Sequence, residues 1–190
     1  MRNDLIFDFE TMGQDVNNCA VIDVSVMVFN WEKMVSDDPY TLADISRCKK
    51  FKLSIKEQVK DYGWKINEST LKFWSEQSKE VRANISPKTS DLSVADFVKQ
   101  FTDFLIEGPK IKYWWSRSNT FDPIILDRLF QSQGKLAHMQ QHLKFWSVRD
   151  TRTYIDAKFD FNLKKNGFAP CANDEKWDSV FKAHDSSWDI

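Results

Sequence analysis

The segment Leu5-Ile6-Phe7-Asp8-Phe9-Glu10-Thr11 decides which fold this sequence indicates. It opens with a short apolar run, which is typical of a central strand buried on both faces. Asp8 and Glu10 follow two residues apart, so they share one face of the strand, about 7 Å apart along it. Two such carboxylates repel each other and resist desolvation, and a divalent cation such as Mg²⁺ or Mn²⁺ removes both penalties. Taken alone, an Asp-x-Glu pair is more often a solvated strand end.

The rest of the sequence predicts strands that alternate with helices. Residues 20–29 are rich in Val and Ile and follow turn-forming residues, which predicts a second strand in a hairpin with the first. We expect further strands at about 50–54, 111–115 and 145–148, and helices at 67–78, at 93–107, from Asp122-Pro123 onward and after Asp150 or Thr151. This order predicts an α/β fold with a central mixed β-sheet flanked by helices.

The composition indicates a folded globular protein, but it does not indicate what the protein binds. With 190 residues, a hydrophobic fraction of 42% and 15 Phe, the chain is expected to fold as a single domain over 1–190. The net charge of −1 gives no global basic field to attract nucleic acid, although a local groove with bound cations would suffice. Three cysteines without Cys-x-x-Cys spacing argue against a disulfide framework or a zinc site. The absence of a long apolar run favours a cytoplasmic protein with no membrane segment.

Two further acidic motifs lie downstream. Asp122 follows a hydrophobic strand and opens a helix, which aims its carboxylate at the carboxyl edge of the sheet, although Asp is also an ordinary helix cap. His184 and Asp189 are separated by five residues, an offset that does not align on one face of a regular helix. They converge only if His184 lies on a loop and Asp189 in the first turn of a following helix. The alternative is a surface histidine with an unrelated acid.

Taken in order, these motifs resemble those of a known enzyme family. Asp8-x-Glu10-Thr11, Phe121-Asp122 and His184 with Asp189 resemble the three exonuclease motifs of the DEDDh branch of the ribonuclease H-like superfamily, most of all the phage exonuclease A type. Residues 70–77 and 149–151 resemble further segments of that type. The resemblance implies a ribonuclease H-like fold and 3′→5′ degradation of single-stranded DNA to mononucleotides. The implied partner is the 3′ end of that strand, without a dedicated protein partner, in the host cytoplasm if the chain is phage-encoded.

The resemblance also implies roles for particular residues. Four acids would hold two Mg²⁺ ions, for which Mn²⁺ can substitute: Asp8, Glu10, Asp122 and Asp189. His184 would act as the general base that takes a proton from the attacking water. Four neighbouring residues are expected to contact the terminal nucleotides: Thr11, Met12, Asn119 and Phe121. Stacking on the last bases suits Phe121 and Met12, although core packing is the commoner role of such a phenylalanine.

Three alternatives remain open at this point. A phosphatase of the haloacid dehalogenase type also begins with a strand and paired acids, but its second acid is an aspartate whereas this chain has Glu10. A ribonuclease H-like module that binds nucleic acid without cutting it is disfavoured by the intact set of polar motif residues. RNA as substrate stays open, because no residue here reads the 2′-hydroxyl decisively. The chain ends at Ile190, one residue after Asp189, so we expect its last helix to be cut short.

Overall fold

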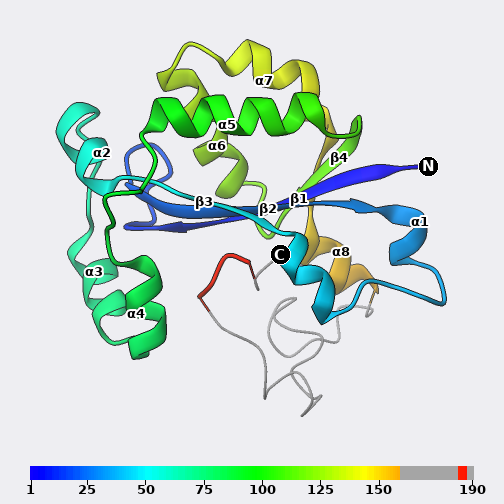
Figure 1. Ribbon diagram of the computed structural model, residues 1–190, viewed down its shortest axis with the longest axis horizontal. Coiled ribbons are helices and arrows are strands. Elements are labelled where there is room, and N and C mark those ends of the chain that lie inside the picture. The colour runs from blue at the N-terminus through cyan, green and yellow to red at the C-terminus, as the bar shows by residue number, and fades with distance from the viewer. Residues whose placement is uncertain (159–183, 188–190) are drawn as a thin grey trace.

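The computed structural model describes residues 1–158 and 184–187, which are arranged around a five-stranded sheet of order β3-β2-β1-β4-β5 (Figure 1). The central strand β1 (Asn3–Thr11) pairs antiparallel with β2 (Val21–Asn30), and β2 pairs antiparallel with β3 (Lys49–Lys52). On its other side β1 pairs in parallel with β4 (Ile111–Ser116), and β4 pairs in parallel with β5 (Val148–Asp150). These pairings confirm the mixed sheet, the central first strand and the hairpin.

Helices cover both faces of this sheet. Figure 1 shows α5, α6 and α7 above the sheet and α8 below it, on the same side as segment 184–187. The helices are α1 (Trp31–Met34), α2 (Ile55–Asp61), α3 (Glu68–Ser75), α4 (Lys79–Ile85), α5 (Val94–Glu107), α6 (Asp122–Ser132), α7 (Leu136–His142) and α8 (Thr151–Lys158), with 3₁₀ turns at Leu42–Arg47 and Phe145–Ser147. Within the described ranges, no helix combines the length and the apolarity needed to cross a membrane.

The predicted helix over 67–78 is α3, which ends three residues earlier than expected. Asn67 caps α3 as expected, since its side chain accepts hydrogen bonds from the backbone N–H groups of Ser69 and Thr70. The helix ends at Ser75, and Ser78 then caps α4 by accepting from the N–H of Val81. Serine favours caps over helix interiors because its hydroxyl competes for backbone groups. The prediction of a helix was therefore confirmed, and its C-terminal end was wrong.

The predicted strand over 145–148 is displaced by three residues. Residues Phe145–Ser147 form a 3₁₀ turn, and β5 occupies Val148–Asp150. Phe145 and Trp146 are 67% and 64% exposed and pack edge to face on each other with ring centroids 4.9 Å apart. Aromatic residues favour strands only where a sheet buries them, and here the turn holds both rings outside the sheet.

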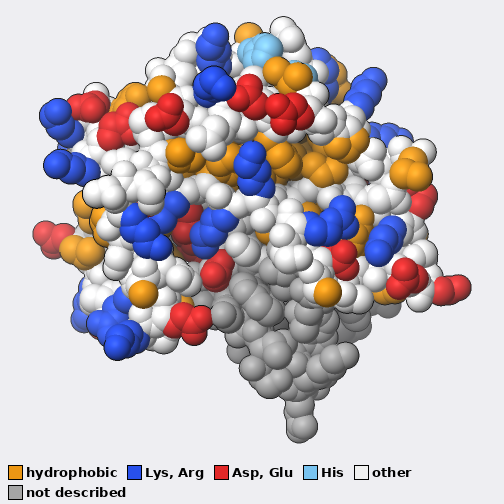
Figure 2. All heavy atoms as spheres, in the orientation of Figure 1, with side chains coloured by type: hydrophobic (Ala, Val, Ile, Leu, Met, Phe, Trp, Pro, Cys, Tyr) orange, Lys and Arg blue, Asp and Glu red, His pale blue; other side chains and the backbone are white. Residues whose placement is uncertain are grey.

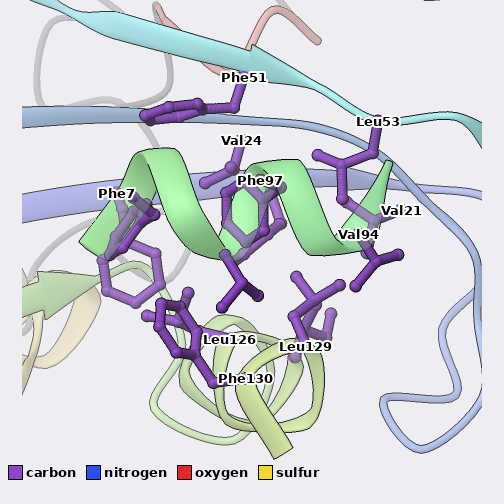
Figure 3. Packing of buried hydrophobic residues seen from close by; sticks show 14 of the residues in the cluster. Phe7, Val21, Val24, Phe51, Leu53, Val94, Phe97, Leu126, Leu129 and Phe130 are labelled. Atoms are coloured by element: carbon purple, nitrogen blue, oxygen red, sulfur yellow. The ribbon is translucent and has the colours of Figure 1, made fainter. Parts of the chain in front are cut away.

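One face of β1 builds the core. Leu5, Phe7 and Phe9 alternate along the strand and are buried in the core cluster. Figure 3 shows Phe7 together with core side chains of β2, β3, α5 and α6. The opposite face of β1 is mixed, because Asp4 is buried whereas Asp8 and Glu10 are half-buried. The strand is therefore fully buried on one face only, not on both as its apolar opening suggests.

We expect Phe101→Ala to lower the free energy of unfolding by about 3–5 kcal/mol, as large-to-small changes at buried phenylalanines do. The Phe101 side chain is 0% exposed, and its ring packs on those of Phe97 and Phe130 with centroids 5.5 and 5.8 Å away. Urea denaturation followed by tryptophan fluorescence measures the change. Phe145→Ala, at an exposed site, is the matched control and should stay within about 0.5 kcal/mol of the parent. Equal effects of the two substitutions would contradict this description of the core.

Candidate active site

The two acids of β1 lie on the sheet face opposite the core. Side chains directly opposite each other in an antiparallel pair share a face, and Asp8 lies opposite Ser25 while Glu10 lies opposite Asp23. Phe7 and Phe9, of the other parity, belong to the core. Asp8 and Glu10 therefore share one half-buried face, as their spacing predicts.

Asp122 meets β1 between these two acids. Its Oδ1 accepts a hydrogen bond from the backbone N–H of Phe9 at 3.3 Å, across 113 residues of sequence. The parallel ladder of β1 and β4 has its last pair at Ile6 and Trp115. The N–H of Phe9 lies beyond that ladder, and the Asp122 carboxylate is its hydrogen-bond acceptor. The helix-cap alternative does not hold, because Phe121 occupies the N-cap position of α6 and no side chain caps the helix.

Burial makes the Asp122 carboxylate costly to ionise. Its residue is 3% exposed, and desolvation raises its pKa from 3.8 to about 7. The N–H of Phe9 and the charge of Arg152 act in the opposite direction, whereas Asp150 raises the pKa further. A buried anion of this kind is stabilised by a bound cation. Among residues 1–158 and 184–187 alone, no three Asp, Glu, His or Cys side chains cluster closely enough to hold a metal ion.

Segment 184–187 lies on the same side of the sheet as α8 (Figure 1), and its first residue, His184, contacts α3. Its ring packs edge-on against the rings of Phe73 and Trp74, with centroids 5.0 and 6.1 Å away. The indole N–H of Trp74 in turn donates to the carbonyl of Thr11, the last residue of β1, at 3.0 Å. The fold therefore connects the histidine to the end of the strand that carries Asp8 and Glu10. Asp189 falls outside the described residues, so its pairing with His184 stays a prediction.

Segment 184–187 is held by residues that sequence reasoning missed. The hydroxyl of Ser186 donates to Asp23 Oδ1 at 2.6 Å and lies 2.8 Å from that of Ser25. Lys50 Nζ forms ion pairs with Asp23 and Asp185 at 3.3 and 3.0 Å. The available signal was the alternation in Val21-Ile22-Asp23-Val24-Ser25-Val26, where polar residues recur at the period of a strand with one polar face.

The four candidate nucleotide contacts differ in what they offer. The Thr11 hydroxyl donates to the carbonyl of Gly13 at 2.7 Å, and Met12 is 6% exposed within the core. Phe121 is half-buried and packs against the core. Asn119 donates its backbone N–H to Asp150, while its buried side-chain oxygen has no hydrogen-bond partner among residues 1–158 and 184–187. Of the four, Asn119 thus has an unused buried acceptor, and Phe121 keeps part of its ring accessible.

On the face drawn in Figure 2, the charges of the described residues do not single out a nucleic-acid site. Figure 2 shows Lys and Arg side chains interspersed with Asp and Glu over the face in view, in keeping with the net charge of −1. A field of one sign would attract a polyanion over long range. On this face, a nucleic acid would have to be attracted by individual nearby side chains and not by a long-range field of one sign.

Comparison with known proteins identifies the family. A family model described as the 3′-5′ exoribonuclease Rv2179c-like domain matches residues 3–184. An exodeoxyribonuclease of Enterobacteria phage T4 is 34% identical over 200 residues, which cover 98% of this chain and 83% of that protein. The family assignment excludes the phosphatase alternative.

Solved structures agree with the fold. A structure of exonuclease I matches 85% of this chain with a TM-score of 0.57 at 13% identity. The E. coli enzyme in complex with a dT13 oligonucleotide matches 87% with a TM-score of 0.56 at 14% identity. This chain spans 31% of each exonuclease I chain, so the likeness concerns the ribonuclease H-like fold. The chain therefore belongs to the Rv2179c-like family of 3′–5′ exonucleases, hydrolases built on the ribonuclease H-like fold.

Proposed function

We propose that this exonuclease removes mononucleotides from the 3′ end of single-stranded DNA with the help of two divalent ions, Mg²⁺ first and Mn²⁺ as a substitute. The observation that carries the proposal is the buried Asp122 carboxylate bonded to the N–H of Phe9, between Asp8 and Glu10. DNA is favoured over RNA because the phage T4 relative, matched over nearly the whole chain, is an exodeoxyribonuclease. A dT13 oligonucleotide also occupies one of the exonuclease I structures.

The residues present fit a divalent ion. The carboxylates of Asp8 and Glu10 share a face, and Asp122 is a buried acid whose ionisation is opposed by desolvation. Hard oxygen donors of this kind suit Mg²⁺ and Mn²⁺. Because the described acids do not by themselves form a cluster close enough for a metal ion, Asp8, Glu10 and Asp122 would hold the ions only together with Asp189 as the fourth ligand. When bound, the ions would supply Lewis acidity and neutralise charge on the scissile phosphate.

The remaining chemistry comes from the chain's own side chains. The imidazole of His184 would accept the proton of the attacking water as general base. The buried Asn119 Oδ1 would accept a hydrogen bond from the terminal nucleotide, because an orphaned buried acceptor is costly until it is paired. Phe121 would pack its accessible ring edge against the last base, since stacking tolerates any sequence.

The substrate is tested with 5′-labelled single strands of DNA and RNA of one sequence, each incubated with Mg²⁺, Mn²⁺ or EDTA. We expect ladders that shorten from the 3′ end, a rate on DNA at least about tenfold above that on RNA, equivalent to about 1.4 kcal/mol in the barrier, and no reaction in EDTA. Circular single-stranded DNA is the control and should resist. Faster digestion of RNA, which the description of the family model names, would overturn the DNA proposal. Full activity in EDTA would overturn the metal proposal.

A further inference from the structure

Two consecutive serines anchor segment 184–187 to β2. Ser186 is 0% exposed, and its hydroxyl both donates to Asp23 Oδ1 at 2.6 Å and lies 2.8 Å from the Oγ of Ser25. The Oγ of Ser187 lies 2.9 Å from that same Ser25 hydroxyl. Side chains of β2 therefore satisfy a buried polar group that would otherwise be costly.

Lys50 of β3 adds a second tether. Its Nζ lies 3.3 Å from Asp23 Oδ2 and 3.0 Å from Asp185 Oδ1. The same Asp185 oxygen accepts the backbone N–H of Ser187 at 3.0 Å. Since Asp23 is 1% exposed, its charge needs these partners, because an unpaired buried carboxylate is strongly unfavourable. Lys50 thus joins the sheet to segment 184–187, because its ammonium group pairs with a carboxylate of each, Asp23 in the sheet and Asp185 in the segment.

The anchoring residues are the cross-strand neighbours of the β1 acids. Ser25 lies directly opposite Asp8, and Asp23 lies directly opposite Glu10. Lys50 lies opposite Ser25 on the outer side of β2. Directly opposed residues have Cβ atoms roughly 4.5–5.5 Å apart, so the segment is attached one strand away from the carboxylates. Its position relative to Asp8 and Glu10 is set by the sheet itself.

His184 lies at the start of this segment in an unusual backbone conformation. Its φ is +62°, and among residues 1–158 and 184–187 no other non-glycine residue has a positive φ. Such conformations persist at non-glycine residues only where the surroundings enforce them. Here Phe73 and Trp74 pack against the ring, and the anchored residues follow immediately in sequence. The two sets of contacts together determine where the imidazole lies.

We propose that Ser186, Asp23 and Lys50 are positioning residues for the hydrolysis, which hold the His184 imidazole in place by tethering its segment to β2 and β3. The inference rests on the proposed role of His184 as general base. These residues act through His184 and do not touch the substrate. Removing a tether lets the imidazole drift, and a misplacement of about 1 Å can cost on the order of 10²-fold in rate.

A double-mutant cycle tests this on the full chain with single-stranded DNA and Mg²⁺. We expect His184→Ala to lower kcat by about 10²-fold or more. Ser186→Ala should lower kcat by about 10- to 100-fold and change KM by less than about threefold, since ground-state binding is not involved. In the His184→Ala background, Ser186→Ala should have no further effect, because coupled residues are non-additive. Asp185→Ala, at a half-buried site with less risk to folding, should show the same pattern with a smaller loss.

The controls separate positioning from general stability. Ser147→Ala removes another buried hydroxyl, which donates to the carbonyl of Lys144 in the turn before β5, and should leave kcat unchanged. Melting temperatures are recorded for every variant, and kinetics are measured well below them. If both Ser186→Ala and Asp185→Ala are folded and keep the parental kcat, or if their losses persist in full without His184, the positioning role is overturned. Parental activity of His184→Ala would instead overturn the proposed general base.

Discussion

Asp8→Asn is expected to lower the rate of 3′-nucleotide release by at least about 10³-fold, because a lost metal ligand removes several kcal/mol of transition-state stabilisation. Asn keeps the shape of the side chain and one oxygen but loses the charge that would hold a divalent ion. Asp8 is half-buried on the polar face of β1 and does not contribute to the core. The fold should therefore survive while the chemistry is lost.

The loss is measured by single-turnover digestion of 5′-labelled DNA at saturating Mg²⁺, with circular dichroism to confirm folding. Asp103→Asn is the matched control, because Asp103 is an acid of α5 outside the candidate site, with a 44% exposed side chain that pairs with Lys99 at 2.8 Å. It should retain the parental rate. A folded Asp8→Asn protein within about tenfold of the parent would show that Asp8 is not a metal ligand, since tenfold corresponds to only about 1.4 kcal/mol.

Asp122→Asn should stabilise the metal-free protein while abolishing its activity. The ionised carboxylate is disfavoured in the fold because burial raises its pKa from 3.8 to about 7, a penalty on the order of 4 kcal/mol. Asn removes the charge and keeps an oxygen that can accept from the N–H of Phe9. In EDTA at pH 8 the variant should melt several degrees higher than the parent, at roughly 2–4 °C per kcal/mol for a chain of this size. Its nuclease rate with Mg²⁺ should fall at least about 10²-fold, on the scale of one lost charge-stabilising group.

The pH dependence has a definite sign. Between about pH 4 and 7 the folded protein binds the Asp122 proton more tightly than the unfolded chain, so the stability of the metal-free parent falls as pH rises through that window and then levels off. The Asp122→Asn variant lacks this contribution and should show a flatter curve. Melting scans in EDTA from pH 4 to 8 measure both, with Asp103→Asn as the control that follows the parent. A lower melting temperature for Asp122→Asn at pH 8 would mean that the carboxylate stabilises the apo fold.

Local sequence signals predicted the elements that carry the acids. The run of apolar residues before Asp8 predicted β1, and the two-residue spacing placed Asp8 and Glu10 on one face, as their opposed partners on β2 confirm. Asn67 predicted the start of α3 because a cap depends on the next three residues alone, and the helical spacing of apolar residues over 93–107 predicted α5. Asp122-Pro123 likewise predicted the start of α6.

Contacts between distant segments could not be predicted in the same way. The sequence aimed the Asp122 carboxylate at the carboxyl edge of the sheet, with a helix cap as the alternative, but it could not give its partner, the N–H of Phe9, 113 residues away, where the β4 ladder no longer extends. The tethers from Asp23 and Ser25 to Ser186 and from Lys50 to Asp185 each span more than a hundred residues, so neither end signals the other. Phe145 and Trp146 look like strand residues and lie exposed in a turn.

The amino-acid sequence by itself determined the central strand, the shared face of its two acids and the order of the motifs, because periodicity and capping depend on neighbouring residues. Only the tertiary structure decided that a buried carboxylate from α6 meets β1 between those acids and that a polar network holds the histidine segment against β2 and β3. Burial and pairing across the sheet are properties of the assembled chain, and they set both the cost of ionising Asp122 and the place of His184.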